Sequence, residues 1–411
     1  MIETDQKIEL LAPAGNMEKL EIAIHYGADA VYLAGKDFSL RNFSENFDLD
    51  ELLKAVEFAH SKSVKVYVAC NIYPRNHEIN EIKDYLLQLG EIGPDAIIIA
   101  DPGIFMQTLS LIPHIPVHLS TQANTTNYKS VYFWEKLGVK RVNLARELSL
   151  DEIREISLRC SSELEVFVHG AMCISYSGRC LLSSYMTNRD SNRGKCSHPC
   201  RWKYAVVEEL RPGKYMPLAE DDRSLYIFSS DDLCMIEHIP DLIEAGILSL
   251  KIEGRMKGIN YVASVVKVYR EAIDSFYECP DKYQIDERWI KELVSISHRN
   301  YCTGFYFGKP DQTSLNVSDR NLIPGNMLLA KITKSKSRYY ESKYYTSIGV
   351  RNKLFKGDDI EILCSRGPVK TDKISDIIDA NGMKIPFAQP GSNVEIAIQN
   401  SCMCNDLIRK I

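Results

Sequence analysis

The sequence predicts an α/β fold: a closed (β/α)8, TIM-like barrel over residues 1–278, followed by a small antiparallel β-barrel over residues 324–411. Eight short apolar runs alternate with segments of helical periodicity in the first part, a pattern typical of a parallel sheet covered by helices. Eight such units favour closure into a barrel. From Pro324 onward, apolar and polar residues alternate instead, as in strands with one buried face.

The expected barrel strands are, in chain order, Ile8–Leu11, Ala30–Leu33, Val64–Ala69, Ala96–Ala100, Val117–Leu119, Arg141–Leu144, Val166–Val168 and Leu248–Ile252. Helical periodicity lies between them, for example at Met17–Tyr26 and Leu52–Ala59. Gly27, Gly138 and Gly246 each precede an expected strand, where a glycine commonly ends the preceding helix. No G-x-G-x-x-G follows the first strand, so the sequence lacks a dinucleotide-binding fingerprint.

The remaining segments complete the expected organisation. Residues 204–230 are expected to form a short β insertion before the seventh barrel helix, and residues 279–323 a connecting region with one helix at Glu287–Ser297. In the C-terminal part the expected strands are LLAKIT, SIGVRN, DDIEILC and SNVEIAI, with glycines marking the turns.

Composition places the chain among cytoplasmic globular proteins. Hydrophobic residues make up 45% of the 411 positions, but no stretch approaches the roughly 18 consecutive apolar residues of a membrane span. The N-terminal MIETDQKIELLAPAG lacks the basic start and apolar run of a signal peptide. Because the cytosol keeps thiols reduced, the 12 cysteines do not indicate a disulfide framework.

Four of these cysteines lie close together, with the spacing Cys173-x6-Cys180-x15-Cys196-x3-Cys200. Thiolates hold iron–sulfur clusters or zinc. Zinc ligands usually come in closer pairs, so the wide spacing modestly favours a cluster and leaves zinc open. The C-x3-C-x2-C spacing of radical S-adenosylmethionine enzymes is absent. Cys234 is an alternative ligand, and basic residues around the cysteines indicate an anionic substrate.

Candidate catalytic residues follow from the barrel prediction, because barrel enzymes carry them at the C-terminal ends of the strands. The candidates at those ends are Arg41, Gln122, Arg146, His169, Glu253 and Arg255. His169 has the side chain for proton transfer near neutral pH, but a packed histidine is the favoured interpretation. Glu253 is expected either to transfer protons or to pair with Arg255, and each arginine is alternatively a surface or ion-paired residue.

The C-terminal part is basic although the whole chain has a net charge of −5: residues 325–411 hold 14 Lys/Arg against 9 Asp/Glu. Eight of the basic residues lie between Lys331 and Lys356, together with Tyr339, Tyr340, Tyr344, Tyr345 and Phe355. Cations that neutralise phosphates and aromatic rings that stack on unpaired bases are typical of single-stranded RNA binders. A solvated basic face is the alternative.

The run Glu165-Val-Phe-Val-His-Gly-Ala-Met-Cys173-Ile-Ser-Tyr-Ser-Gly-Arg-Cys180-Leu-Leu-Ser183 resembles the signature of the U32 peptidase-like family. ELLAPAGNMEKLEIAIHYGADAVYLAG, HLSTQANTTN, SLKIEGRMKG and the C-terminal domain are also similar to family segments, so the resemblance covers nearly the full length. Within the family, the length and the single C-terminal β domain look most like the branch of prephenate-dependent tRNA uridine(34) hydroxylases.

The resemblance implies a [4Fe-4S] cluster held by Cys173, Cys180, Cys196 and Cys200, with Cys234 as an alternative fourth ligand. It also implies O2-independent hydroxylation of the wobble uridine at C5, with prephenate as the source of the hydroxyl group and the anticodon loop of tRNA as the partner. Arg41, Arg146 and Arg255 would then bind the two carboxylates of prephenate. Gln122 would bind a uracil edge, with helix capping as the equal alternative. An electron donor is a further expected partner if the cluster passes electrons.

Two other functions remain open from the sequence. One is the peptidase activity of the family's historical label, which needs an activated nucleophile or an open zinc site. The sequence contains no H-E-x-x-H and no G-x-S-x-G, so this is the weaker interpretation. The other is a non-catalytic, cluster-bearing RNA-binding partner of another enzyme.

Overall fold

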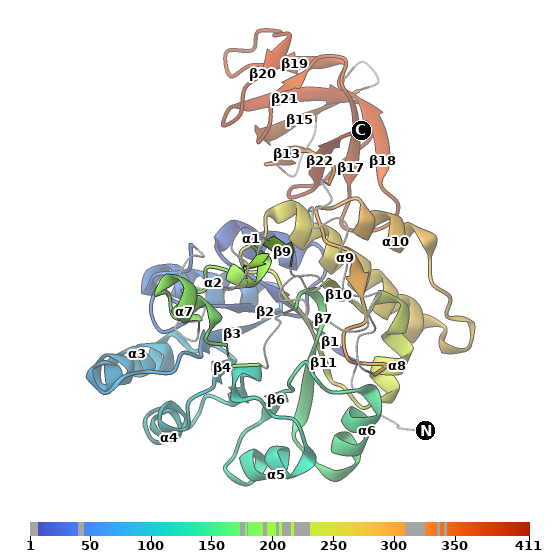
Figure 1. The fold of residues 1–411 in the computed structure, drawn as a ribbon. Coiled ribbons are helices and arrows are strands. Elements are labelled where there is room, and N and C mark those ends of the chain that lie inside the picture. Colours follow the sequence, from blue (N-terminus) through green and yellow to red (C-terminus); the bar gives the residue numbers. More distant parts are fainter. Residues whose placement is uncertain are drawn as a thin grey trace.

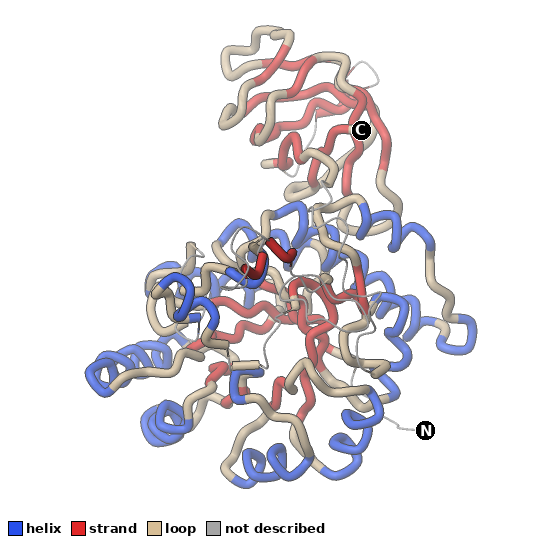
Figure 2. The backbone as a smooth tube through the Cα atoms, viewed as in Figure 1, coloured by secondary structure: helices blue, strands red, loops and turns tan. Residues whose placement is uncertain are grey.

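A computed structural model of the chain describes residues 7–39, 45–172, 177–178, 180–191, 195–202, 205–207, 215–217, 231–308, 325–334, 338–340 and 343–411. The chain forms a helix-covered barrel and a separate C-terminal β domain, which stands beside one end of α9 (Ile259–Glu278) (Figure 1). Figure 2 shows the strands at the centre of the lower part, surrounded by helices. None of the described helices is long and apolar enough to span a bilayer.

Eight parallel strands form the barrel: β1 (Glu9–Pro13), β2 (Ala30–Leu33), β3 (Lys65–Cys70), β4 (Ala96–Ile99), β5 (Val117–Leu119), β6 (Arg141–Asn143), β7 (Glu163–Ala171) and β11 (Ser249–Ile252). Neighbours in this order are paired, and β11 pairs with both β7 and β1, which closes the barrel. The predicted fold class is confirmed. The seventh strand is longer than its apolar run suggested, because Glu163 and Glu165 also belong to it.

The barrel helices are α1 (Met17–His25), α2 (Leu49–Ser61), α3 (Ile79–Ile92), α4 (Pro102–Leu111), α5 (Tyr128–Lys136), α6 (Leu150–Arg159), α8 (Ile239–Glu244) and α9. Local sequence explains where several of them begin. The side chains of Asp48 and Ser149 each accept a hydrogen bond from the backbone N–H three residues later. The glutamate side chain at that later position accepts a hydrogen bond from the backbone N–H of Asp48 or Ser149 in turn. Gly27 and Gly138 follow helix ends with φ of 104° and 98°, as the sequence predicted.

The segment between β7 and β11 contains additional short elements. The helix α7 (Leu182–Thr187) lies within the cysteine segment, and β8 (Ala205–Val207) pairs with β9 (Tyr215–Pro217), where a β insertion was expected. β10 (Asp232–Cys234) pairs antiparallel with β7, and β12 (Tyr301–Cys302) pairs with β10. β10 and β12, with three and two residues, are too short to show a periodic pattern, so the sequence did not predict them.

The C-terminal domain is an antiparallel sheet that runs in the order β18 (Lys370–Lys373), β17 (Asp359–Leu363), β22 (Leu407–Lys410), β13 (Leu328–Ile332), β15 (Lys343–Val350), β21 (Asn393–Ile398) and β19 (Asp376–Ile378). β14 (Arg338–Tyr340) pairs with β15, and β16 (Leu354–Phe355) pairs with β20 (Phe387–Ala388). One face buries an aliphatic core that includes Ile332, Ile348 and Ile396. Strands with this antiparallel pattern were predicted here.

Buried Arg409 joins the two domains. Its guanidinium is fully buried and donates to Glu292 Oε1 (2.6 Å) on α10 (Glu287–Val294) and to Ser264 Oγ (2.8 Å) on α9. Its other terminal nitrogen reaches Glu361 Oε1 of β17 at 3.2 Å. Because charge-assisted bonds to both domains converge on one buried side chain, the C-terminal domain has a defined orientation on the barrel.

Candidate functional site

A small cavity opens at the C-terminal ends of the barrel strands. Its volume is about 70 Å³, and its lining includes four of the six candidate catalytic residues: Gln122, Arg146, Glu253 and Arg255. The sequence placed these four residues at strand ends, and the structure brings them together. Arg41 lies outside the described residues.

Each of the four residues is held by contacts of its backbone or its side chain. Gln122 belongs to a 3-10 turn after β5, and its backbone carbonyl accepts a hydrogen bond from the hydroxyl of Tyr73. The Arg146 guanidinium lies 3.9 Å from the centre of the Phe167 ring and donates to the carbonyl of Ala171 at 3.1 Å.

Arg255 and Glu253 follow β11 and line the same cavity. Arg255 is 4% exposed, and its Nη2 donates to Ser39 Oγ at 3.2 Å. The backbone of Glu253 is held at both ends: its N–H donates to the carbonyl of His169 (2.9 Å), and its carbonyl accepts from the hydroxyl of Tyr261 (2.8 Å). The cavity is therefore a rigid pocket with two arginines and one glutamate on its wall.

Lys251 also lines this cavity, and the sequence analysis missed it. The residue is 4% exposed, its Nζ donates to Glu165 Oε1 at 2.7 Å, and the same atom lies 4.5 Å from the Tyr32 ring centre. Burial lowers the pKa of Lys251 although Glu165 acts in the opposite direction. The available signal was strand alternation: Lys251 stands two residues before Glu253 and so points to the same side.

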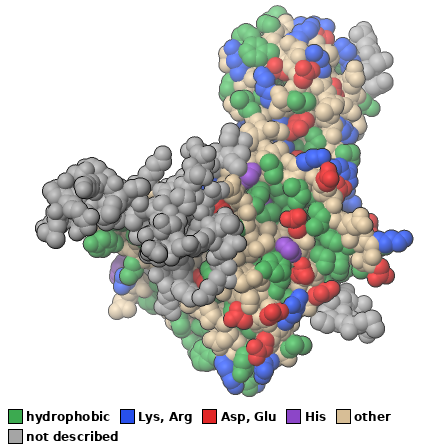
Figure 3. All heavy atoms as spheres, turned by 45° about the vertical axis from the view of Figure 1, so that its right-hand side comes forward, with side chains coloured by type: hydrophobic (Ala, Val, Ile, Leu, Met, Phe, Trp, Pro, Cys, Tyr) green, Lys and Arg blue, Asp and Glu red, His purple; other side chains and the backbone are tan. Residues whose placement is uncertain are grey.

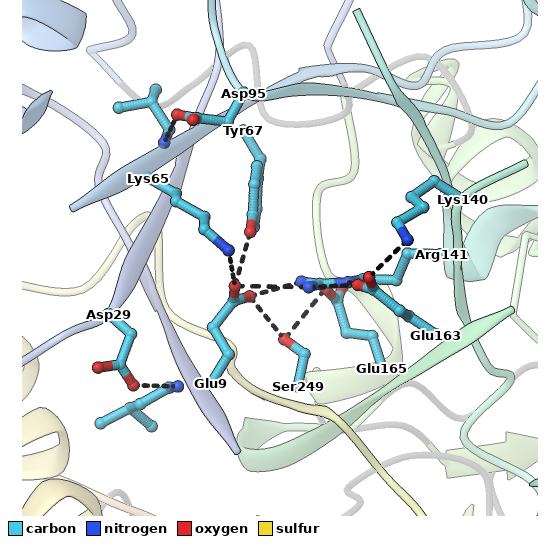
Figure 4. Close-up of polar contacts among 12 residues, drawn as sticks. Glu9, Asp29, Lys65, Tyr67, Asp95, Lys140, Arg141, Glu163, Glu165 and Ser249 are labelled. Carbon is cyan, nitrogen blue, oxygen red and sulfur yellow. Dashed lines mark hydrogen bonds and ion pairs between the residues drawn. The ribbon is translucent and has the colours of Figure 1, made fainter. Parts of the chain in front are cut away.

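A network of buried charges lies below the cavity at the N-terminal ends of the strands (Figure 4). Arg141 is 3% exposed and bonds to Glu9, Glu163 (2.7 Å) and Glu165 (3.5 Å). Glu9 also accepts from the hydroxyl of Tyr67 at 2.7 Å. Because these carboxylates are all bonded, the charged barrel interior is satisfied and holds Glu165 in place beneath Lys251.

His169 does not line the cavity, in contrast to the expectation that it stands at the catalytic mouth. The pairing of β7 with β11 shifts register after Phe167, which places His169 opposite Ile252. Its ring then packs among Tyr261, Tyr269 and Tyr301 and is 1% exposed. Burial lowers the pKa of His169 to about 3, so it stays neutral at physiological pH. The packed histidine, not the proton shuttle, fits this position.

The cysteine segment folds back on itself beside the cavity. Cys180, Cys196 and Cys200 are partly buried, and Cys173 lies outside the described residues. The Ser191 hydroxyl donates to the carbonyl of Cys180 at 2.6 Å. Ser183 and Ser197, which follow Cys180 and Cys196 closely in sequence, are hydrogen-bonded through their hydroxyls at 3.0 Å. The two halves of the segment are thus held together.

Gly178 brings this segment against the cavity wall. A Cβ atom at this position, where φ is 74°, would lie 2.2 Å from the backbone oxygen of Gln122. Only glycine allows so close an approach. The N–H of neighbouring Ser177 donates to Glu147 Oε1 at 3.0 Å, next to Arg146. Ser177 and Gly178 therefore pack on the segments that follow β6 and β5.

The described thiols have the donor chemistry of a thiolate-bound cluster. The backbone N–H of His198 donates to Cys196 Sγ at 3.4 Å, a type of bond that tunes cluster sulfur atoms. Among the described residues, no three His, Cys, Asp or Glu side chains are grouped to hold a metal ion. Cys234 lies in β10 instead, where burial raises its pKa to about 11.

The basic run of the C-terminal domain divides into two environments. Lys331 is 13% exposed at its side chain and pairs with Glu18 of α1 at 3.0 Å, and Arg351 also bonds to Glu18, so both belong to the domain interface. Lys353 lies 4.9 Å from the Phe355 ring centre and 4.4 Å from that of Phe387.

These three residues form an exposed group, which we call the aromatic platform. The Phe355 and Phe387 residues are 41% and 38% exposed. The two rings are 6.0 Å apart at their centres. Figure 3 shows hydrophobic and basic side chains interspersed on the C-terminal domain. The platform is therefore accessible to a partner.

Comparison with known proteins covers both domains. The model of peptidase family U32 matches residues 15–316, and the model of the peptidase family U32 C-terminal domain matches residues 330–409. A Bacillus subtilis protein named tRNA hydroxylation protein P1 is 40% identical over 98% of this chain and 95% of its own length. The Escherichia coli tRNA hydroxylation protein P is 35% identical over 95% and 93%.

A third relative is named for a different RNA. The Escherichia coli 23S rRNA 5-hydroxycytidine C2501 synthase is 34% identical over 68% of this chain and 41% of its own length. The family match extends over most of the barrel, and the full-length relatives include the C-terminal domain as well. On both grounds, the chain belongs to peptidase family U32.

Proposed function

We propose that this protein hydroxylates C5 of the wobble uridine 34 of tRNA without O2, with a [4Fe-4S] cluster and with prephenate as the hydroxyl source. One observation carries the proposal: a cation-lined cavity lies directly against the cysteine segment through the contact between Gly178 and Gln122. Two relatives aligned over nearly the whole chain are named as tRNA hydroxylation proteins, and a third as an rRNA hydroxycytidine synthase.

In this proposal Cys173, Cys180, Cys196 and Cys200 hold the cluster. When bound, the cluster would supply either a metal centre that polarises the oxygen donor or an electron relay. The electron relay would require an electron-donor partner. The protein's own residues provide the surroundings. The N–H of His198 stabilises the negative charge on Cys196 Sγ, and Ser183 and Ser197 keep the two halves of the segment together.

The arginines of the cavity support an anionic co-substrate. Arg146 and Arg255, together with Arg41, would bind the two carboxylates of prephenate, because guanidinium groups bind carboxylates in a bidentate manner. Gln122 lines the same cavity beside the cysteine segment and would hydrogen-bond the uracil edge. Glu253 also lines the cavity and would orient Arg255 or accept a proton.

The C-terminal domain supplies the proposed contact with the anticodon loop. Unpaired bases stack on exposed aromatic rings while lysines neutralise phosphates, and the aromatic platform offers both. Arg409 fixes the orientation of this domain on the barrel, so the platform and the cavity are held in a constant geometry. A tRNA substrate would place the protein in the cytoplasm.

The test uses anaerobically purified protein, its iron and sulfide content, and nucleoside analysis of tRNA incubated with prephenate. We expect about four iron and four sulfide per chain and formation of 5-hydroxyuridine. Cys180→Ala should lose both the cluster and the product. Cys279→Ala is the matched control, since Cys279 is an exposed thiol at the end of α9.

Four results would contradict the proposal. Full product formation by a cluster-free Cys180→Ala protein would remove the cluster from the mechanism. One zinc with no sulfide would indicate a hydrolytic or a structural metal site. Peptide turnover abolished by Arg146→Ala would support the peptidase interpretation. Tight tRNA binding by a cluster-loaded protein that forms no product would indicate a non-catalytic partner.

A further inference from the structure

We propose that Lys251 is a third cation of the barrel cavity and binds the carboxylate head of a hydroxylated carboxylic acid. This inference rests on the proposed function in one respect, namely that the acid would then be prephenate. Lys251 lies below the strand ends, on the floor of the cavity whose wall carries Arg146 and Arg255. Catalytic residues were expected only at the strand ends, so this lysine has no role in the function described above.

Geometry places Lys251 and Arg146 on one aromatic ring. The Arg146 guanidinium lies 3.9 Å and Lys251 Nζ 5.6 Å from the centre of the Phe167 ring. Lys251 is paired with Phe167 in the register of β11 and β7, so the backbone itself holds the two residues side by side. Two cations are therefore fixed around Phe167 at the cavity surface, in a setting where water is largely excluded.

The charges in this region leave a place for an anion. Glu165 bonds to Lys251 at 2.7 Å but is also shared with Arg141 at 3.5 Å in the network below. Arg146 bonds only to a backbone carbonyl and to the Phe167 ring within the described part of the chain. Like charges held close together in a medium of low dielectric repel one another, so a carboxylate between Lys251 and Arg146 relieves that repulsion.

Asn143 indicates that the ligand also carries a hydrogen-bond donor. It lies on β6, lines the same cavity and is 2% exposed, and its Oδ1 has no hydrogen-bond partner among the described residues. Buried polar atoms are nearly always paired in folded proteins. A ligand hydroxyl would supply the missing donor, which is why the proposed class is a hydroxylated carboxylic acid.

The size of the cavity limits which part of the ligand enters it. A volume of about 70 Å³ is well below the roughly 300 Å³ at which pockets begin to enclose whole drug-sized ligands. It accommodates a carboxylate head with its neighbouring atoms. The remainder of the ligand would extend toward the cysteine segment, which packs against Gln122 at the edge of the cavity.

The test measures binding of prephenate and of malate, an unreactive hydroxylated dicarboxylate, to cluster-loaded protein by titration calorimetry. Lys251→Met should weaken both affinities by about tenfold or more, the loss typical of a charge-assisted hydrogen bond. Lys267→Met is the matched control: Lys267 is likewise buried and paired with a glutamate, Glu271 at 2.9 Å, but lies outside the cavity. The Lys267→Met protein should bind both acids with the affinities of the unaltered protein.

Lys251→Gln keeps a hydrogen-bond donor for Glu165 and replaces the methionine variant if that protein does not fold. Unchanged affinities in a folded Lys251 variant would overturn the inference. Hydroxylation assays distinguish failure of this inference from failure of the proposed function. If the variant forms product with an unaltered KM for prephenate, only the role of Lys251 is refuted. Acid binding that depends on Lys251, without any product from the unaltered protein, refutes the proposed function and leaves the binding site.

Discussion

The interiors of the two domains differ in kind. The barrel interior holds Glu9, Arg141, Glu165 and Lys251, each at most 8% exposed, whereas the apolar core of the C-terminal domain consists of aliphatic residues and two cysteines. The fully buried Asp406 and Arg409 of this domain pair instead with His25 and Glu292, across the contact with the rest of the chain. Burial of aliphatic side chains stabilises a fold directly. Buried ion pairs add little over an apolar core of the same shape. The barrel interior is therefore organised to hold charged side chains in position, and the C-terminal interior to hold a binding surface rigid.

The largest expected effect comes from removing the centre of the charged network. Arg141→Met should lower the free energy of unfolding by about 3–5 kcal/mol, because it leaves the carboxylates of Glu9 and Glu163 without their buried cation. Urea unfolding measures the change. Arg351→Met, which removes an arginine 43% exposed at its side chain, is the control and should cost less than about 1 kcal/mol. Equal losses in the two variants would mean that the network has no special role.

A smaller effect is expected from pH. Burial holds the pKa of His118 well below its usual value, whereas unfolded histidine binds a proton below about pH 6.5. Because the unfolded chain then binds more protons, stability falls as the pH drops below that value. Between pH 7 and pH 5 the barrel should lose stability through His118, by at most about 2 kcal/mol.

His118→Gln tests this assignment, and amide hydrogen exchange resolves the two domains. The variant should be less sensitive to acid than the unaltered barrel by that amount. Residues 325–411 contain no histidine, so the C-terminal domain should keep its protection over the same range. An identical pH response of the variant and the unaltered protein would show that another group controls the acid sensitivity.

The smallest effect on stability is expected at the aromatic platform. Phe387→Ala removes a ring that is 38% exposed and should change the free energy of unfolding by no more than about 0.5 kcal/mol. Its affinity for tRNA should nevertheless fall about fivefold or more, since each stacked base contributes about 1–3 kcal/mol. Filter binding measures the affinity, with Met383→Ala, another exposed residue of the domain, as the control. Unchanged tRNA affinity would place the RNA contact elsewhere.

Much of the fold was accessible from the sequence because the signals are local. Ala30–Leu33 and Val117–Leu119 were predicted with the bounds that the structure shows, since each is a short apolar run between helical segments. The strand-end rule then located Gln122, Arg146, Glu253 and Arg255, which share one cavity. Local apolar patterns specify which elements form, and the closed barrel brings the ends of its strands together.

Tertiary structure alone decided what the polar residues within the strands do. Glu165 and Lys251 interrupt apolar runs, and only closure of the barrel shows that they meet in its interior at 2.7 Å. His169 was assigned to the mouth by the same strand-end rule, but a register shift between β7 and β11 moved it among three tyrosines. The sequence by itself determined the elements and their order. The contacts of charged and titratable side chains depend on register and closure, which no local pattern encodes.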